Sequence, residues 1–385
     1  MPGVSGKAAI AGVYEHPTRW APDKTLIQIG AEAALGALAD AGLKMSDVDA
    51  LYMSGMPGLQ PIIYAEYLGI NPKILDSTSV GGSSFNSHVG HALYAIAAGA
   101  CEVALITYGS NWSSAGVAVG TGGPRSESAP PDNFENPFGP TTVGAYALVA
   151  QRYMHEFGLT AEQLAEVAVT MRRHASLNPY AKYRDPLTIE DVLNSRMISD
   201  PLHMLDCCMI SDGGGAIVVT SPRRARSLRK KPVLVLGHGE AVTHTSRGKR
   251  DFSRMAASQS GPRAMAMAGV THDNIDMAMV YDSFTITVIS TIENLGFCGI
   301  GEGGSFVQDG RIGLGGQLPL NTDGGGLSSN HPGMRGIFLV IEAVKQLRGE
   351  CGDRQVPNCK VALTHGTGGW LGMRHSGVTL VLGAD

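Results

Sequence analysis

The sequence predicts an α/β protein made of two related halves. Apolar runs that suit strands alternate with segments of helical periodicity, a pattern typical of a parallel sheet covered by helices. The triplet at residues 41–43 has a counterpart at 268–270, and residues 101–105 have one at 359–363. The 385 residues, 43% of them hydrophobic, are many for one domain and natural for two fused halves. We therefore interpret the chain as an internal duplication.

The first half reads as alternating strands and helices. Residues 7–13 are rich in alanine, isoleucine and valine, as in a buried parallel strand. Helical periodicity covers residues 25–41 and stops before a glycine. Residues 50–53 and 101–108 follow as apolar strands, and between them a helix over residues 89–99 is apolar on nearly every face. A helix of that kind is buried.

The glycine- and serine-rich turn at residues 79–88, just before this helix, is the first candidate for chemistry. The free N–H groups of a buried helix start attract negative charge, including a charge that develops during a reaction. The same residues would also suit a plain glycine turn that leads into a core helix. The duplication favours the first interpretation, because alignment of the two halves brings His331 opposite Gly81.

The middle of the chain interrupts the pattern. Glycine, serine, proline and asparagine dominate residues 110–140, which is too long for an ordinary connection and indicates a functional loop or a partner surface. A linker is expected at 221–231, so the halves are residues 1–225 and 226–385. The other expected elements are helices at 143–157 and 161–175, an irregular segment at 178–188, and strands at 216–220, 232–236 and 277–280.

Composition excludes several classes of protein. The net charge is −4 with mixed signs, so nothing suggests nucleic-acid binding. The N-terminus has no signal-peptide pattern and no apolar run is long enough to span a bilayer, so we expect a cytoplasmic protein. The six cysteines are scattered without a C-x-x-C pair, which argues against a zinc site in this chain.

Four segments of the second half, residues 281–285, 301–304, 319–325 and 342–349, together resemble the thiolase superfamily. The chain is most similar to the lipid-transfer-protein type, related to the thiolase part of sterol carrier protein x, over its whole length. The resemblance implies a thiolase fold, in which duplicated βαβαβαββ halves form an α-β-α-β-α arrangement of five layers. It also implies an inserted loop domain at about 110–205 that covers the site and helps to bind coenzyme A.

Thiolases carry a cysteine nucleophile at the start of the first buried helix, and this chain departs from that pattern. No cysteine precedes residue 101, and the nucleophile's position falls on Gly82, or on Ser83 after a shift of one residue. A glycine cannot carry an acyl group, and a serine hydroxyl needs an adjacent base. Gly82 and Ser83 are therefore candidates for an oxyanion hole or for the nucleophile's position.

Three polar residues match other catalytic positions of the family. His331 matches the histidine that activates the nucleophile and binds the thioester oxygen, although it could be a turn histidine before a proline. Tyr281 stands where relatives have Asn or His, and its hydroxyl could move a proton unless the ring only packs in the core. His365 takes the place of the second cysteine, which moves the α-carbon proton, and an imidazole can do this near pH 7. We expect three further residues to bind substrate: Phe284, Gly325 and Gly368.

A base without an obvious nucleophile leaves three functions open. One is a retro-aldol lyase that cleaves the Cα–Cβ bond of a β-hydroxyacyl-CoA in lipid, steroid or aromatic side-chain degradation. The second is a thiolase or acyltransferase with a non-cysteine nucleophile, and the third is a non-catalytic lipid or acyl-CoA carrier. The family's side-chain aldolases resemble this chain in lacking the cysteine and in having a tyrosine at Tyr281, but they tend to have a tyrosine where it has His331.

The resemblance also implies binding partners. Coenzyme A is expected as part of the thioester substrate, without a metal. A homodimer is expected to pair the strand at 101–108 across a two-fold axis, because that strand would be a hazardous free edge in a monomer. A small subunit with an OB-fold and a zinc ribbon is expected, with residues 110–140 as a candidate docking surface. The sequence does not identify the acyl chain.

Overall fold

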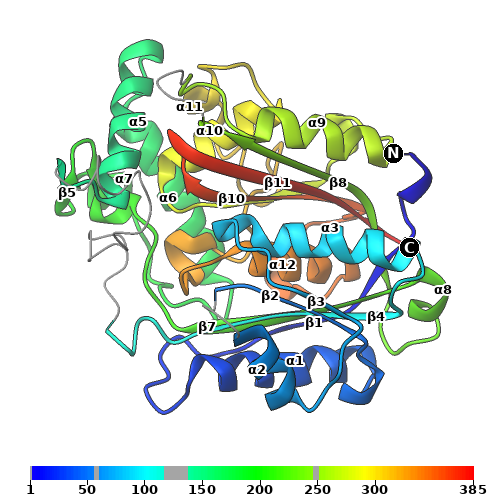
Figure 1. Cartoon of the computed structure of the whole chain (residues 1–385). Coiled ribbons are helices and arrows are strands. Elements are labelled where there is room, and N and C mark those ends of the chain that lie inside the picture. The colour runs from blue at the N-terminus through cyan, green and yellow to red at the C-terminus, as the bar shows by residue number, and fades with distance from the viewer. Residues whose placement is uncertain (1, 56–59, 117–137, 246–250) are drawn as a thin grey trace.

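The computed structural model describes residues 2–55, 60–116, 138–245 and 251–385. Five layers follow one another from bottom to top in Figure 1: helices, sheet, helices, sheet, helices. This confirms the thiolase fold expected from the resemblance. The strands of the main sheet are β1 (Ala9–Glu15), β2 (Ala50–Met53), β3 (Ile74–Asp76), β4 (Val103–Ser110), β7 (Gly213–Thr220), β8 (Val233–Thr243), β9 (Met277–Val280), β10 (Val361–Trp370) and β11 (Met373–Ala384).

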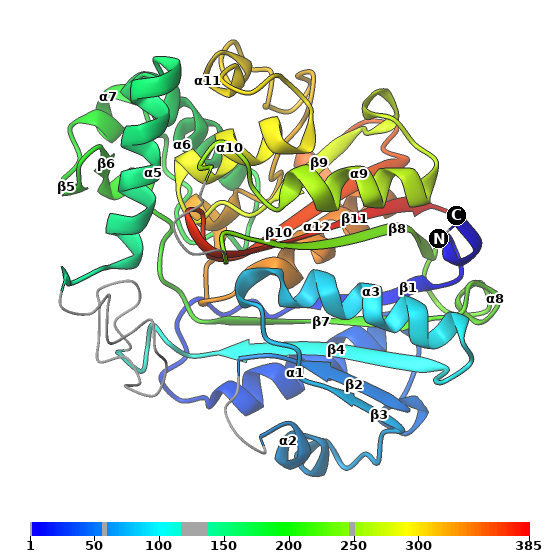
Figure 2. The ribbon, with the colours of Figure 1, turned by 45° about the horizontal axis from the view of Figure 1, so that its top comes forward.

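Hydrogen bonds join these strands into one nine-stranded sheet in the order β3-β2-β4-β7-β1-β8-β11-β10-β9. The first five come from residues 1–225 and the last four from residues 226–385. The halves meet through β1 and β8, which pair only at Ala9 with Leu234 and at Ile10 with Val233. The sheet therefore splits into two layers beyond that short junction, as Figure 2 shows. The domain boundary at 225 stays a prediction.

The sheet is mixed, so the expectation of a wholly parallel sheet, with a parallel strand at residues 7–13, was wrong. β2 runs parallel to β3 and β4. β7 runs antiparallel to both β4 and β1. The last strand of each half turns back beside its neighbours in this way, since β11 likewise runs antiparallel to both β10 and β8.

The middle layer consists of α3 (Ser84–Ala97) and α12 (Gly336–Arg348), one from each half. They start close together, because a Cβ added to Gly336 would lie 2.2 Å from the carbonyl oxygen of Gly82. Only glycine permits this approach of two backbones. The N–H groups of both helix starts therefore point to one region.

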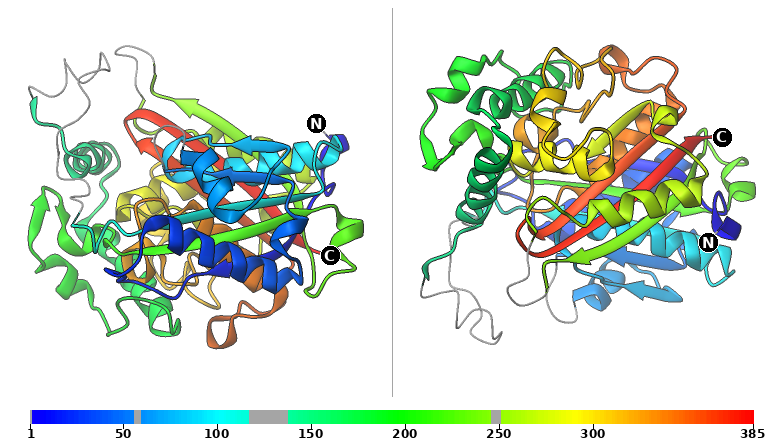
Figure 3. Two further views of the ribbon diagram at one scale, coloured as in Figure 1. Left: turned by 60° about the horizontal axis from the view of Figure 1, so that its bottom comes forward. Right: turned by 90° about the horizontal axis from the view of Figure 1, so that it is seen from above.

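The outer layers cover the two sheets, as the two views of Figure 3 show. α1 (Leu26–Ala41) and α2 (Gln60–Leu68) lie on the first half, and α9 (Ala257–Ala268) and α10 (Thr285–Leu295) on the second. α1 matches its expected range, because Thr25 caps its start with a capping box and Gly42 ends it in the left-handed conformation, φ 77°. The short helices α8 (Pro222–Ala225) and α11 (Gly303–Phe306) lie at the periphery.

The inserted segment forms a cluster at one end of the layers, on the left in Figure 1. It comprises α5 (Thr142–Phe157), α6 (Ala161–Ser176), α7 (Ile189–Leu193) and the hairpin of β5 (Met197–Ser199) and β6 (Leu202–His203). Much of residues 110–140, including the glycine-rich run at 120–124, lies outside the described residues. The described part has no helix that is long and apolar enough to cross a membrane.

The strand expected at 101–108 is present as β4, but it is not an edge. β4 pairs with β2 on one side, over Ala104 to Thr107, and with β7 on the other over its whole length, so it lies inside the sheet. The open edge of the first half is instead β3. The argument that placed the dimer contact on β4 was therefore wrong, because the sequence reveals the apolar character of a strand but not its place in the sheet.

Candidate active site

A cavity of about 730 Å³ opens between the inserted cluster and the starts of α3 and α12. Its volume lies in the range of sites that enclose a small molecule, roughly 300–1,000 Å³. Apolar side chains from the insertion form one wall. They include Ile198, Met204, Leu205, Met209 and Ile210. The opposite wall carries the polar groups, so the cavity has an apolar side and a reactive side.

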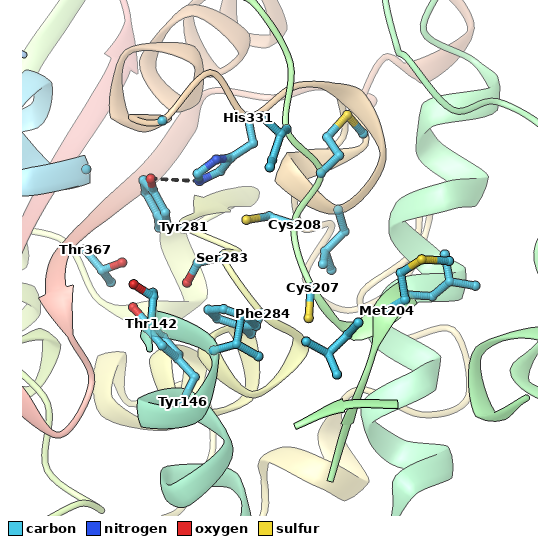
Figure 4. A pocket seen from close by; sticks show the side chains of 18 of the residues that line it. Thr142, Tyr146, Met204, Cys207, Cys208, Tyr281, Ser283, Phe284, His331 and Thr367 are labelled. Atoms are coloured by element: carbon cyan, nitrogen blue, oxygen red, sulfur yellow. Dashed lines mark hydrogen bonds between the residues drawn. The ribbon is translucent and has the colours of Figure 1, made fainter. Parts of the chain in front are cut away.

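Tyr281 and His331 form the centre of the polar wall. Tyr281 follows directly after β9, and His331 lies on the loop that leads into α12. The Tyr281 hydroxyl lies 3.0 Å from His331 Nε2, and the two rings are nearly perpendicular with centroids 5.7 Å apart. Figure 4 shows this hydrogen bond at the edge of the cavity. The structure therefore brings the two residues together, as the sequence analysis expected.

The hydrogen bonds around this pair indicate where its protons are. The backbone N–H of Arg335 donates to the Tyr281 oxygen at 3.3 Å. With Tyr281 donating its own proton to His331 Nε2, the single N–H proton of the neutral imidazole is on Nδ1. No described residue pairs with this buried Nδ1 atom. His331 thus has one nitrogen engaged with Tyr281 and one buried nitrogen without a partner among the described residues.

Burial keeps both groups uncharged at neutral pH. It lowers the pKa of His331 to about 4, and the nearby Arg335 charge acts in the same direction. Burial also raises the pKa of Tyr281 well above its ordinary value. The imidazole is therefore a neutral base over the whole range above about pH 5, and the phenol keeps its proton until a base removes it.

A buried ionic network fixes the loop beneath the pair. The fully buried Arg335 side chain lies 3.3 Å from Asp282 Oδ1 and 2.5 Å from Asp323 Oδ2. Its Nη1 also donates to the side chain of Asn330 at 2.6 Å. Loss of one partner from such a network leaves an uncompensated buried charge and costs about 3–5 kcal/mol. Arg335 therefore positions both the tyrosine oxygen and the histidine loop.

The Tyr281 ring occupies the space beside Gly82 where the family's nucleophile is expected. A Cβ at Gly82 would lie 2.2 Å from Tyr281 Cε2 and 2.6 Å from the carbonyl oxygen of Thr367. Ser83 does not line the cavity, since it is fully buried and bonded to the Val80 carbonyl and to Ser376 Oγ at 2.8 Å. Of the two candidates, only Gly82 reaches the wall.

Two other expected site residues do not reach the cavity. His365 is fully buried within the sheet, where its Nδ1 lies 2.8 Å from Thr379 Oγ1. The part of β10 that lines the cavity is its end, from Thr367 to Trp370, and His365 precedes it. Gly325 contacts the ionic network instead, where an added Cβ would lie 1.9 Å from Asp282 Oδ2. The other two expected substrate-binding residues, Phe284 and Gly368, do line the cavity.

Several residues of the wall were not predicted from the sequence. Cys208 lines it beside the Tyr281–His331 pair, Cys207 lines it near Phe284, and the rings of Tyr146 and Phe284 lie 4.3 Å apart between centroids. These cysteines and this tyrosine come from the insertion and from the strand-like return that follows it. The sequence signal for Tyr146 is its position in the expected loop domain, and the two cysteines lie just after that segment.

Two arginines, Arg172 and Arg196, line the cavity. Arg172 of α6 donates to Ser328 Oγ at 2.9 Å and lies 5.4 Å from the Tyr183 ring centroid. Arg196 is exposed at the mouth, between α7 and β5. The two positive charges would attract a negatively charged ligand. Among the described residues, no cluster of histidine, cysteine and acidic groups could hold a metal ion.

Comparisons with known proteins agree with this geometry. Residues 239–384 match the family model described as thiolase C-terminal domain-like. The chain is 37% identical to a steroid side-chain-cleaving aldolase of Thermomonospora curvata, over 100% of both chains. It is 37% identical to a 17-hydroxy-3-oxo-4-pregnene-20-carboxyl-CoA lyase of Mycobacterium tuberculosis, over 95% of this chain and 97% of the lyase. The solved structure of the Ltp2-ChsH2(DUF35) aldolase superposes with a TM-score of 0.90 at 36% identity, over 99% of both chains.

Proposed function

Because the chain belongs to the thiolase superfamily, with close relatives among steroid side-chain-cleaving aldolases, we propose that it is an acyl-CoA C–C lyase. It cleaves the Cα–Cβ bond of a β-hydroxyacyl-CoA in a retro-aldol reaction. The observation that carries this proposal is the 3.0 Å contact between Tyr281 and His331, in a site where the tyrosine ring takes the nucleophile's space. A retro-aldol needs a base and a place for the enolate, and no acyl-enzyme.

The Tyr281–His331 pair supplies the base. The substrate's β-hydroxyl donates to the Tyr281 oxygen, and the phenol proton passes to His331 Nε2. The Cα–Cβ bond then breaks, its electron pair moves toward the thioester carbonyl, and the β-carbon becomes a ketone or aldehyde. A proton transfer of this kind contributes roughly 10²–10⁴-fold to the rate.

The enolate oxygen needs a donor, and His331 is suited to this role as well. Its buried Nδ1–H has no partner among the described residues. When the relay has put a proton on Nε2, the ring becomes an imidazolium, and its positive charge lies beside the forming enolate. The low pKa of His331 means that this charge is costly unless the enolate balances it, so the charge develops together with the transition state.

Coenzyme A would be held by the insertion. Arg172 and Arg196 are the positive groups of the cavity, and the phosphates of coenzyme A are the negative groups of the substrate. Guanidinium groups bind phosphate with two parallel hydrogen bonds, which favours arginine at such sites. The apolar wall from residues 198–210 suits a bulky acyl part such as a steroid nucleus, the class that the relatives' names indicate.

We also propose two partners. Strand β3 is an open edge, and exposed apolar residues of α2 and β3 lie beside it, namely Ile62, Ile63, Tyr67 and Leu75. An open edge with apolar neighbours favours pairing with a second copy of the chain. A small OB-fold and zinc-ribbon subunit remains proposed from the family resemblance, and the similar Ltp2-ChsH2(DUF35) aldolase, whose name joins two components, supports it.

A product assay tests the proposed reaction. The purified chain, alone and with a co-expressed OB-fold subunit, is incubated with a β-hydroxyacyl-CoA and with the corresponding β-ketoacyl-CoA, each with and without free coenzyme A. We expect a free ketone or aldehyde and a shortened acyl-CoA from the hydroxy substrate, at a rate independent of free coenzyme A. Cleavage that requires both the keto substrate and free coenzyme A would instead establish a thiolase. Binding without turnover in all arms would indicate a carrier.

A further inference from the structure

We propose that Cys208 is the acid that protonates the α-carbon of the enolate formed by cleavage, an inference that rests on the proposed function. A retro-aldol leaves the departing thioester as an enolate, and its α-carbon must gain a proton before release. His365 was expected to perform this step. His365 does not line the cavity, and its Nδ1 lies 2.8 Å from Thr379 Oγ1 instead. Another proton donor is therefore needed.

The chain at residues 207–211 crosses the site beside both members of the catalytic pair. The Cys208 N–H donates to the Ser283 carbonyl at 2.9 Å, two residues after Tyr281. Ser211 exchanges hydrogen bonds with His331, accepting from its N–H at 3.0 Å and donating to its carbonyl at 3.3 Å. The position of Cys208 is therefore fixed relative to both residues.

The Cys208 side chain points into the cavity toward this pair. Figure 4 shows its sulfur on the side of Tyr281 and His331, whereas the sulfur of Cys207 points away from them. Successive residues of an extended chain alternate in direction, and Cys207 has extended dihedral angles, φ −101° and ψ 143°. Cys207 Sγ instead lies 3.3 Å from the His203 carbonyl.

The surroundings keep Cys208 in the form that donates a proton. Burial raises the pKa of the thiol well above its ordinary value, and the neighbouring Asp282 acts in the same direction. A protonated thiol is a poor nucleophile, so this environment argues against an acyl-cysteine. A thiol is nevertheless a stronger acid than the alcohol groups of Ser283 and Thr367 on the same wall, and it is a far stronger acid than the α-carbon that it protonates.

The protons balance over the cycle without a cofactor. The hydroxyl proton moves through Tyr281 to His331, the Cα–Cβ electron pair becomes the enolate, and the Cys208 S–H proton forms the new Cα–H bond. The resulting thiolate takes the extra proton from the His331 imidazolium. Both residues then return to their neutral starting state, and the net change is transfer of one proton from the hydroxyl to the α-carbon.

The test uses deuterium oxide and 17-hydroxy-3-oxo-4-pregnene-20-carboxyl-CoA as the probe. The α-carbon of this thioester bears a methyl group, so the released propionyl-CoA becomes chiral when it gains one deuterium. We expect a single configuration from the wild-type protein. Cys208→Ala should give both configurations and turn over at least tenfold more slowly, because solvent then protonates the enolate from either face.

Two further variants serve as controls. Cys207→Ala removes the neighbouring thiol of the same wall and should retain a single configuration, and Cys208→Ser should restore much of the stereochemical preference because it keeps a donor at that position. An unchanged configuration and rate in Cys208→Ala would overturn the inference and leave the lyase function intact. An acyl adduct on Cys208 in mass spectrometry would also overturn it. Absence of ketone from the wild-type protein would contradict the proposed function itself.

Discussion

Replacement of Gly82 by alanine should disable the site through Tyr281, although it adds a single methyl group. The new carbon would lie 2.2 Å from Tyr281 Cε2 and 2.5 Å from Cζ, whereas non-bonded carbons normally approach to about 3.5–4.0 Å. The ring must therefore move by roughly 1 Å or more, because the third neighbour, the backbone carbonyl of Thr367 at 2.6 Å, belongs to a strand and cannot yield easily.

The expected cost has two parts. Overpacking of this kind destabilises a folded protein by about 1–3 kcal/mol. Displacement of the ring also breaks the 3.0 Å contact with His331, so the rate of ketone release should fall by roughly 10²–10⁴-fold. Gly82→Cys should behave in the same way and should not gain thiolase activity, because its sulfur has no room while Tyr281 remains.

The assay is steady-state ketone release combined with a thermal melt. Gly3→Ala is the matched control, because its added Cβ has no atom within 4 Å and it should therefore retain both rate and melting temperature. If Gly82→Ala kept its rate within about tenfold of wild type, the close packing of the Tyr281 ring against Gly82 would not be needed to position the tyrosine. A Gly82→Cys variant that performed thiolysis would refute the reasoning more strongly.

Three further predictions follow from other parts of the molecule. Ser83→Ala should keep its turnover within about tenfold of wild type, since the hydroxyl bonds to Ser376 and does not line the cavity. A folded variant without activity would contradict this. Arg172→Met should raise KM for the acyl-CoA by about tenfold or more and leave kcat nearly unchanged, because a charge-assisted hydrogen bond to a coenzyme A phosphate contributes about 1.5–3 kcal/mol. An unchanged KM would show that Arg172 does not bind the phosphate. The free energy of unfolding should decline as pH falls from about 6.5 toward 4, by up to about 1.4 kcal/mol per pH unit for each buried histidine. The reason is that these histidines bind protons at a higher pH in the unfolded chain than in the folded one. A melting temperature that stays constant between pH 7 and 5 would contradict this. The histidines concerned have folded-state pKa values lowered by burial to about 4 (His88, His174, His331) or about 3 (His365, His375).

The sequence was informative where local chemistry determines structure. The expected strand at 50–53 and the helix at 25–41 match β2 and α1 to within a residue, because their apolar spacing and caps are local signals. The resemblance to thiolases then correctly predicted the five-layer arrangement. The start of α3 came earlier than expected, at Ser84, because small polar residues can be helical when tertiary packing buries them.

Other features depend on distant contacts and could not be read from the sequence. The neighbours of β4 and the direction of β7 depend on which strands pair after the long insertion. Whether His365 reaches the cavity depends on how far along β10 the cavity extends, and the packing of the insertion decides this. Cys208 and Arg172 reach the site only because the insertion folds back over it, and no local pattern distinguishes them from ordinary residues.

A double-mutant cycle on Tyr281 and His331 tests the central claim most directly. If the two residues form one proton relay, Tyr281→Phe and His331→Ala should each lower the rate of ketone release by roughly 10²–10⁴-fold. The double variant should then be about as slow as the slower single variant, since a broken relay cannot be broken twice. Losses that multiply in the double variant, or single variants that retain nearly full activity, would contradict the account.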